Sequence, residues 1–232
     1  MRRCAETTSG IEESNRRFRR IACGRIAPPP ASPALPPDPN EAAGRFAGSI
    51  GYVIPPIELS PDIRLRTLER ADAETLAAAH RLNREYLAPW EPLRSPGFYT
   101  AHGQLEAIGR QVADRDAGRS LPWVLATTDE VIGQATLSGI THGAFESAAL
   151  GYWIDQRYQG RGLMTRALTA VVEVSRSVLG LHRLEAQTLP VNEASQHLLG
   201  KLGFERIGYA PRYLRIAGQW QDHVMYQLIL AD

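Results

Sequence analysis

The residues with the clearest chemical potential are two glycines, Gly160 and Gly162, which lie one residue apart between two apolar segments. The run 148–154 predicts a strand, and the residues from 163 onward predict a helix. A turn from strand to helix directs several backbone N–H groups toward one point, at the positive end of the helix dipole. Glycines also leave room for a phosphate to approach the main chain. The sequence therefore predicts a phosphate-binding loop.

Two familiar phosphate loops do not fit this turn. A Walker A loop requires a lysine next to its last glycine, whereas the only lysine of the chain, Lys201, lies far downstream. A dinucleotide-binding loop requires a third glycine three positions after the second, and Thr165 stands there. These differences disfavour both a Walker-type nucleoside triphosphatase and a Rossmann-type dinucleotide site.

The elements around the turn follow from the spacing of apolar residues. A packed helix is expected after the turn, with a stripe formed by Leu163, Ala167, Leu168, Val171, Val172 and Val178. Residues 183–188 alternate between apolar and polar, which predicts a half-buried strand. A second helix is expected after Asn192, with Ala194, Leu198, Leu199 and Leu202 on one face and Gly203 as its C-cap. Asn192 and Ser195 stand three apart at its start, a spacing that also suits a plain helix cap.

Four separated segments form a larger pattern. They are residues 83–92, Arg157-x-x-Gly160-x-Gly162, Asn192-x-x-Ser195 followed by residues 199–204, and residues 213–223. The second and third resemble the signature of the GNAT acetyltransferase superfamily. The first and last are similar to its RimJ and RimL branch, which acetylates the N-termini of ribosomal proteins. The resemblance covers roughly residues 60–230.

The resemblance implies an α/β fold, in which a mixed, strongly twisted sheet is flanked by helices. Two central strands should splay apart around acetyl-coenzyme A (acetyl-CoA), with the glycine loop on its diphosphate and the preceding strand along its pantetheine arm. The residues expected to bind acetyl-CoA are Tyr152, Trp153, Ile154, Arg157, Gln159, Gly160, Arg161, Gly162, Met164, Thr165, Asn192 and Lys201. Strand alternation predicts that Tyr152 and Ile154 point to one sheet face and Trp153 to the other.

The resemblance also implies catalytic roles. It places the Asn192 amide on the pantetheine and the Ser195 hydroxyl near the departing thiolate, as a general acid. The acidic residue that often precedes the Tyr-Leu pair in this branch is Arg212 here, so the identity of the base is open. Glu91 is the candidate base, acting through water. The residues expected to line the acceptor pocket are Trp90, Tyr213, Trp220 and Asp222, of which Asp222 is a second candidate base or a loop-orienting residue.

Composition limits the classes of protein to which the chain can belong. The 232 residues and the net charge of +1 suit one catalytic domain, residues 58–232, that does not bind nucleic acid directly. Residues 1–57 are expected to be a disordered Arg/Pro-rich extension or the product of a start codon assigned too far upstream. No apolar run approaches the ~20 residues of a membrane span, and a cytoplasmic location is expected. Arginine outnumbers lysine 25 to 1, and alanine and proline are abundant, which favours a GC-rich, bacterial coding sequence. Both cysteines, Cys4 and Cys23, precede the domain, and neither a disulfide framework nor a metal site is expected.

The expected reaction is N-acetyl transfer from acetyl-CoA to a primary amine, with a protein N-terminus favoured as acceptor. A small-molecule amine such as an antibiotic or a polyamine is the alternative within this class, and an acidic pocket floor would favour it. A non-catalytic acyl-CoA sensor is a second alternative because of Arg212. A third is a ribosome-tethered factor that uses the basic residues 16–20. The oligomeric state is open between monomer and homodimer.

Overall fold

Alternating strands and helices form the fold, in the order that the sequence predicts around the glycine turn. The computed structural model describes residues 54–230, so the predicted extension lies outside the described residues except for its last four positions. The elements are β1 (Ile57–Ser60), β2 (Ile63–Thr67), η2 (Arg70–Asp72), α2 (Ala73–Leu82), α3 (Arg84–Leu87), η3 (Pro96–Tyr99), α4 (Ala101–Asp116), β3 (Ser120–Ala126), β4 (Val131–Thr141), β5 (Ser147–Ile154), η4 (Gln156–Tyr158), α5 (Leu163–Ser177), β6 (Arg183–Thr188), α6 (Glu193–Lys201), β7 (Glu205–Ile216) and β8 (Gln219–Ile229).

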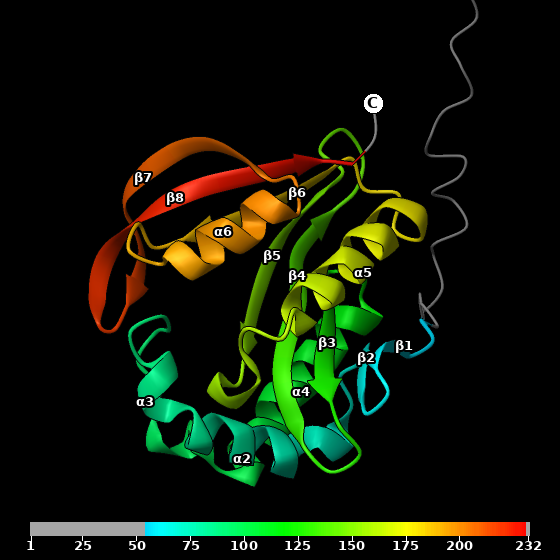
Figure 1. Cartoon of the computed structure of the whole chain (residues 1–232), viewed down its shortest axis with the longest axis vertical. Helices are drawn as coiled ribbons and strands as arrows, with labels where there is room; N and C mark the ends of the chain where they lie inside the picture. Colours follow the sequence, from blue (N-terminus) through cyan, green and yellow to red (C-terminus); the bar gives the residue numbers. More distant parts are fainter. Residues whose placement is uncertain (1–53, 231–232) are drawn as a thin grey trace, which may run out of the picture. The chain divides into compact units, whose positions relative to one another are not determined.

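An eight-stranded sheet with the order β1-β2-β3-β4-β5-β6-β8-β7 forms the centre (Figure 1). Every neighbouring pair is antiparallel except β5 and β6, which are parallel. These two strands pair only between residues 147–149 and residues 183–185. Their remaining residues are not bonded to each other, so the strands splay apart. The predicted α/β fold with a mixed sheet and two splayed central strands is confirmed.

Helices cover both faces of the sheet (Figure 1). Helix α5 packs against β1 and β4, and α2 and α4 pack against β4 and β3. Tyr152 and Ile154 of β5 pack with the core that includes α5, whereas Trp153 packs with the core of α2 and α4. The predicted alternation of these three side chains is therefore confirmed. Within residues 54–230, no helix combines the length and the hydrophobicity that crossing a bilayer requires.

Two details of the predicted helices need correction. Val178 does not belong to the buried stripe of α5, because the helix ends at Ser177 and the Val178 side chain is 49% exposed. Ala194 does not pack in the core with Leu199 but is exposed on α6. The rest of the α5 stripe is buried or half-buried, as expected from its spacing.

Candidate active site

The glycine loop has the backbone geometry that the sequence predicts. Gly160 and Gly162 both have φ of 70°, and Gly162 is the N-cap residue of α5. A Cβ atom built on Gly160 would meet no other atom within 4 Å, so the space beside the main chain is open. A groove of about 400 Å³ lies along this loop and α6. The loop therefore fits a group that approaches the main chain closely, such as a phosphate.

The groove contains most of the residues that the sequence predicts for acetyl-CoA. Its lining residues are Ile154, Tyr158, Gln159, Gly160, Gly162, Leu163, Met164, Thr165, Ala194, His197, Leu198 and Lys201. Sequence reasoning missed five of them: Tyr158 and Leu163 beside the glycines, and Ala194, His197 and Leu198 on α6. Helical spacing marks Ala194 and Leu198 as one face, but it does not tell a groove from a core.

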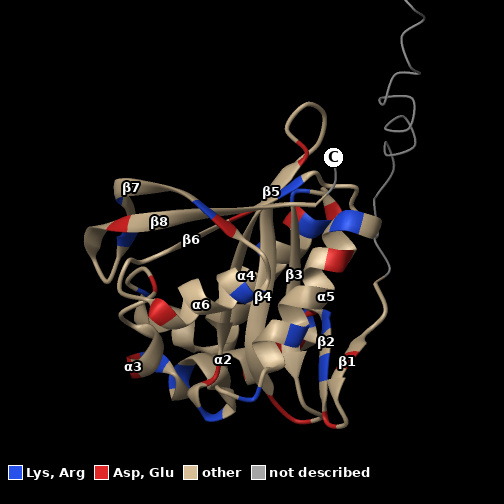
Figure 2. Cartoon of the chain, turned by 45° about the horizontal axis from the view of Figure 1, so that its top comes forward, with Lys and Arg blue, Asp and Glu red and all other residues tan. Residues whose placement is uncertain are grey.

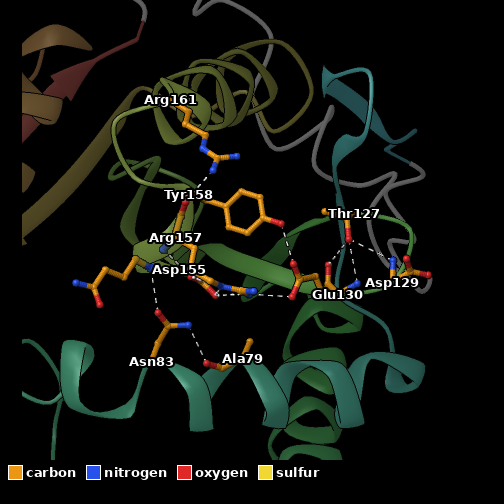
Figure 3. Close-up of polar contacts among 10 residues, drawn as sticks. Ala79, Asn83, Thr127, Asp129, Glu130, Asp155, Arg157, Tyr158 and Arg161 are labelled. Carbon is orange, nitrogen blue, oxygen red and sulfur yellow. Dashed lines mark hydrogen bonds and ion pairs between the residues drawn. The ribbon is translucent and has the colours of Figure 1, made fainter.

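An ion-pair network holds the loop in place (Figure 3). The buried Asp155 carboxylate accepts hydrogen bonds from the main chain and the guanidinium of Arg157, both at 2.8 Å. The Arg157 guanidinium also donates to Glu130 at 2.8 Å, and the Tyr158 hydroxyl donates to Glu130 at 2.7 Å. Burial acts to raise the pKa of Asp155, but the hydrogen bonds and charge of Arg157 outweigh burial and lower it. The Arg157 side chain is therefore engaged within the loop and does not line the groove.

Asn83, at the end of α2, joins the loop to the helical layer (Figure 3). Its side chain is buried, and its Oδ1 accepts a hydrogen bond from the Gln156 main-chain N–H at 3.0 Å. Its Nδ2 donates to the Ala79 carbonyl, also at 3.0 Å. Residues 83–92 belong to the pattern that the sequence analysis singled out, but this contact spans 73 positions and has no local signal.

Replacing Asn83 by alanine is expected to lower the free energy of unfolding by about 2 kcal/mol, because the Gln156 N–H loses its buried acceptor. Urea unfolding followed by tryptophan fluorescence measures the change. Ser177→Ala is the control, since it removes an exposed hydroxyl that donates only to the Glu173 carbonyl and should change stability by about 0.5 kcal/mol or less. Equal, small effects of both variants would contradict the anchoring role of Asn83.

A pair of hydroxyl groups lies where β5 and α6 approach each other. The Tyr152 hydroxyl and the Ser195 hydroxyl are 2.8 Å apart. The Ser195 main-chain N–H donates to Asn192 Oδ1 at 3.1 Å, so Asn192 is the side-chain N-cap of α6. Burial raises the pKa of Tyr152 to about 12. Tyr152 is thus neutral at physiological pH, and either hydroxyl of the pair can donate to the other. Sequence reasoning missed this contact because the two residues are 43 positions apart.

Three further residues predicted for acetyl-CoA lie outside the groove lining. The Arg161 guanidinium stacks over the Tyr158 ring at 4.9 Å and lines a neighbouring cavity. Trp153 packs against the His80 ring, with centroids 4.8 Å apart. Asn192 acts on the main chain of α6. None of these three side chains lines the groove in this structure.

A second groove, of about 480 Å³, contains three of the four residues that the sequence predicts for the acceptor. Trp90, Trp220 and Asp222 line it. Tyr213 does not line it, and its ring packs beside His223 at 5.5 Å. Asp222 accepts hydrogen bonds from the Tyr209 hydroxyl at 2.5 Å and from the Arg212 main-chain N–H at 2.8 Å. These two bonds lower its pKa, so Asp222 is a weak base that orients its loop.

The predicted base, Glu91, lies in a different cavity of about 140 Å³, together with His80 and Arg94. Burial raises the pKa of Glu91, and the nearby Arg94, whose Nε is 3.3 Å from the carboxylate, offsets part of this rise. The Glu91 carbonyl accepts a hydrogen bond from Ala217 in the turn between β7 and β8. The loop of Glu91 therefore borders both the small cavity and the second groove, but the carboxylate does not line that groove.

No group of three or more His, Cys, Asp or Glu side chains within residues 54–230 is arranged to hold a metal ion. Basic and acidic residues are interspersed along α5 and over the other elements of the ribbon (Figure 2).

Comparison with known proteins agrees with this geometry. Residues 62–205 match the GNAT acetyltransferase domain family. The [ribosomal protein uS5]-alanine N-acetyltransferase of Escherichia coli (strain K12) is 37% identical over 182 residues, which cover 77% of this chain and 94% of that protein. The structure of ribosomal-protein-S5-alanine acetyltransferase from Vibrio fischeri superposes with a TM-score of 0.73 at 33% identity, covering 77% of this chain and 98% of that one.

A third similar protein is Mycobacterium smegmatis RimJ in complex with CoA-disulfide. It has a TM-score of 0.69 and 30% identity, and the match covers 72% of this chain and 81% of that one. GNAT acetyltransferases use acetyl-CoA, so the predicted enzyme class and the predicted cosubstrate are confirmed. The chain belongs to the GNAT acetyltransferase family, in its RimJ/RimL-type branch.

Proposed function

We propose that this protein transfers the acetyl group of acetyl-CoA to the N-terminal amine of a protein, with a ribosomal protein as the favoured acceptor. The observation that carries the proposal is the Tyr152–Ser195 hydroxyl pair, which lies between the splayed strand β5 and the start of α6, the helix that lines the glycine-loop groove. The 37% sequence identity to a uS5-alanine N-acetyltransferase, over 94% of the length of that protein, supports the choice of acceptor. Residues 58–232 are proposed to suffice for catalysis.

The glycine-loop groove is proposed to hold acetyl-CoA, which supplies an activated thioester when bound. The main-chain N–H groups around Gly160 and Gly162 would hold its diphosphate, and the positive charge of Lys201 at the end of α6 would complement it. Ile154, Ala194 and Leu198 would contact the apolar parts of the pantetheine arm. Ser195, oriented by Tyr152, would donate a hydrogen bond to the departing sulfur. A free thiol has a pKa of about 8.5, so its thiolate departs readily with modest help.

The acceptor amine needs to lose a proton. An α-amino group titrates near ~7.8, so an appreciable fraction is already neutral at pH 7. Glu91 is proposed to accept the remaining proton through water, because its raised pKa makes it a better base than Asp222, whose pKa is lowered. Asp222 is proposed to shape the acceptor groove.

Replacing Glu91 by glutamine is expected to lower kcat about tenfold at pH 7, because only amine that is already neutral would react. This deficit should shrink about sevenfold between pH 7 and pH 9, as the neutral fraction of the amine rises. Wild-type activity should be lost on acidification as Glu91 takes up a proton. The raised pKa of Glu91 places this loss at a higher pH than for an ordinary glutamate. Initial rates of thiol release across this pH range measure both effects.

Two variants give the matched comparison. Glu85→Gln alters an exposed carboxylate on α3, only six positions away, and should leave the rate unchanged. Asp222→Asn should raise KM for the acceptor without the change in pH profile. A Glu91→Gln enzyme with the wild-type rate at pH 7 would remove Glu91 from the mechanism.

The remaining alternatives give different results in simple assays. The acceptor groove contains one acidic and one basic side chain, Asp222 and Arg212, and therefore does not have the acidic floor that would favour a polycationic small molecule. A non-catalytic sensor would bind acetyl-CoA tightly but release no thiol in the presence of a peptide mixture. A ribosome tether would show salt-sensitive co-sedimentation that deletion of residues 1–57 abolishes. Comparison of N-terminal acetylation with and without the gene, by mass spectrometry, tests the proposed function itself.

A further inference from the structure

We infer that the acceptor groove recognises an extended protein N-terminus that has apolar residues and an acidic side chain among its first few positions, and that Arg212 is the residue that selects the acidic side chain. This inference rests on the proposed function, because it concerns the amine acceptor of the same site. It adds the chemical class of the acceptor sequence beyond its first residue.

The mouth of the groove is unusually apolar. Leu93, Val191 and Trp220 have the most exposed large hydrophobic side chains within residues 54–230, with 75%, 74% and 63% of each accessible. Val191 and Trp220 line the groove itself. Leu93 lines the neighbouring small cavity of Glu91 instead, and its side chain lies close to Gly218 in the turn between β7 and β8. Apolar side chains that gather around one opening indicate a macromolecular ligand.

An extended peptide whose N-terminal amine lies in the groove also contacts the exposed apolar side chains at the mouth, Val191 and Trp220, which we call the apolar rim. Each residue of an extended chain advances about 3.3 Å, so the second and later residues of an acceptor would pass over Val191 and Trp220. A small-molecule amine would fill the inner part of the groove and leave these side chains in water. The rim therefore favours a protein N-terminus as the occupant.

Arg212 lies in a β-bulge and has a left-handed backbone conformation. The pairing of β7 with β8 shifts register between Ala210 and Leu214, and Arg212 within this bulge has φ of 49°. A left-handed conformation costs an L-residue about 1–2 kcal/mol. Bulges redirect side chains, and the hydrogen bond from the Arg212 main-chain N–H to Asp222 holds this one. The bulge thus presents the Arg212 side chain to the groove that it lines.

The Arg212 guanidinium has no carboxylate at ion-pair distance within the described part of the chain, although its charge acts on the nearby Asp222 over a longer range. The guanidinium forms none of the ion pairs found in that part. The neighbouring Asp222 carboxylate is already bonded to Tyr209 and to the Arg212 main chain. A guanidinium binds a carboxylate through strong charge-assisted hydrogen bonds. An acidic side chain of the acceptor would therefore gain affinity here, and a basic one would be repelled.

Nine peptides test the charge preference directly. They share an N-terminal alanine and an otherwise identical ten-residue sequence, and they carry glutamate, glutamine or lysine at each of positions 2 to 4 in turn. Wild-type enzyme should show kcat/KM about tenfold higher for the best glutamate peptide than for its lysine counterpart, the low end for an exposed charged hydrogen bond. Arg212→Glu should invert this order. Arg215→Glu is the control, because that guanidinium donates to the Gly218 carbonyl at the hairpin turn, and the order should stay as in wild type.

The apolar rim has its own test. Trp220→Ser and Val191→Ser should lower kcat/KM for the ten-residue peptide severalfold but leave that for alaninamide unchanged. Phe145→Ser, at an exposed apolar side chain between β4 and β5, should change neither. Equal loss for the peptide and for alaninamide would place these side chains at the reacting amine rather than at a peptide rim.

The results separate the inference from the function on which it rests. Acetylation of all peptides with the same order in Arg212→Glu as in wild type would overturn the inference and leave the proposed function standing. Binding of acetyl-CoA without acetylation of any peptide would overturn the proposed function, and the inference would fall with it. An inverted order cannot result from misfolding, because a smaller folded fraction lowers the rate with every peptide by the same factor and leaves their order unchanged.

Discussion

Replacement of Gly162 by valine is expected to weaken acetyl-CoA binding at least about 100-fold. The residue has φ of 70°, a conformation that costs an L-residue about 1–2 kcal/mol and a β-branched one more. Relaxation of this strain would turn the main-chain N–H groups at the start of α5 away from the groove. Loss of one charge-assisted hydrogen bond to a phosphate costs about 1.5–3 kcal/mol, and the two effects together exceed a factor of 100. Isothermal titration calorimetry with acetyl-CoA measures the change.

Gly143 provides a matched control for this variant. It lies in the exposed loop between β4 and β5 and has φ of 78°. An added Cβ there would meet nothing within 4 Å, and at Gly162 it would meet only the end of the flexible Arg166 side chain, at 3.4 Å. Gly143→Val therefore imposes the same backbone penalty away from the groove and should lower the melting temperature without changing the Kd. An unchanged Kd in folded Gly162→Val would show that the diphosphate is not held by this loop.

The part of the site that could be predicted from the sequence is the part built from local pattern. The apolar run of β5, the two glycines and the helical spacing of α5 are contiguous, and the structure confirms that they form a strand, a turn and a helix. The following strand β6 and helix α6 are likewise contiguous and have their predicted order. Consecutive elements whose spacing is regular need no tertiary information for their assignment.

The residues that hold these elements in place could not be predicted in the same way. Glu130 meets Arg157 across 27 positions, and Tyr152 meets Ser195 across 43. Such contacts arise when the sheet is assembled, and the sequence contains no periodic signal for them. The pattern that includes Arg157 likewise does not reveal whether its guanidinium or its main chain faces the groove.

The arrangement of the residues around the second groove was the hardest to predict, because these residues lie on irregular backbone. Arginine at positive φ is uncommon, so nothing in the sequence indicates the bulge that places Arg212 beside Asp222. Spacing also gave no reason to separate Glu91 from Trp90, although the loop directs these neighbouring residues into different cavities. Sequence reasoning identified most of the residue types there but not their arrangement.

Removal of the Ser195 hydroxyl is expected to have the largest effect on turnover. Ser195→Ala should lower kcat about 100-fold, the low end for a general acid, because a thiolate is already a tolerable leaving group. Tyr152→Phe should lower kcat about tenfold, since it removes only the hydrogen bond that orients Ser195. Neither change should alter KM for acetyl-CoA more than about twofold if binding depends on the glycine loop. Steady-state rates with saturating acceptor peptide measure both constants.

The double variant decides whether the two hydroxyls act as one unit. If Tyr152 acts through Ser195, the Tyr152→Phe/Ser195→Ala enzyme should be about 100-fold slower than wild type, like Ser195→Ala alone. Once the Ser195 hydroxyl is absent, the Tyr152 hydroxyl has no group to orient, so its removal has no further effect. Independent action predicts a loss of about 1000-fold. Tyr226→Phe is the control for a lost tyrosine hydroxyl, since that hydroxyl donates to Gln196 at 3.2 Å and not to Ser195. A multiplicative loss in the double variant would assign Tyr152 a separate function in the reaction, and a wild-type rate in Ser195→Ala would exclude Ser195 as the proton donor.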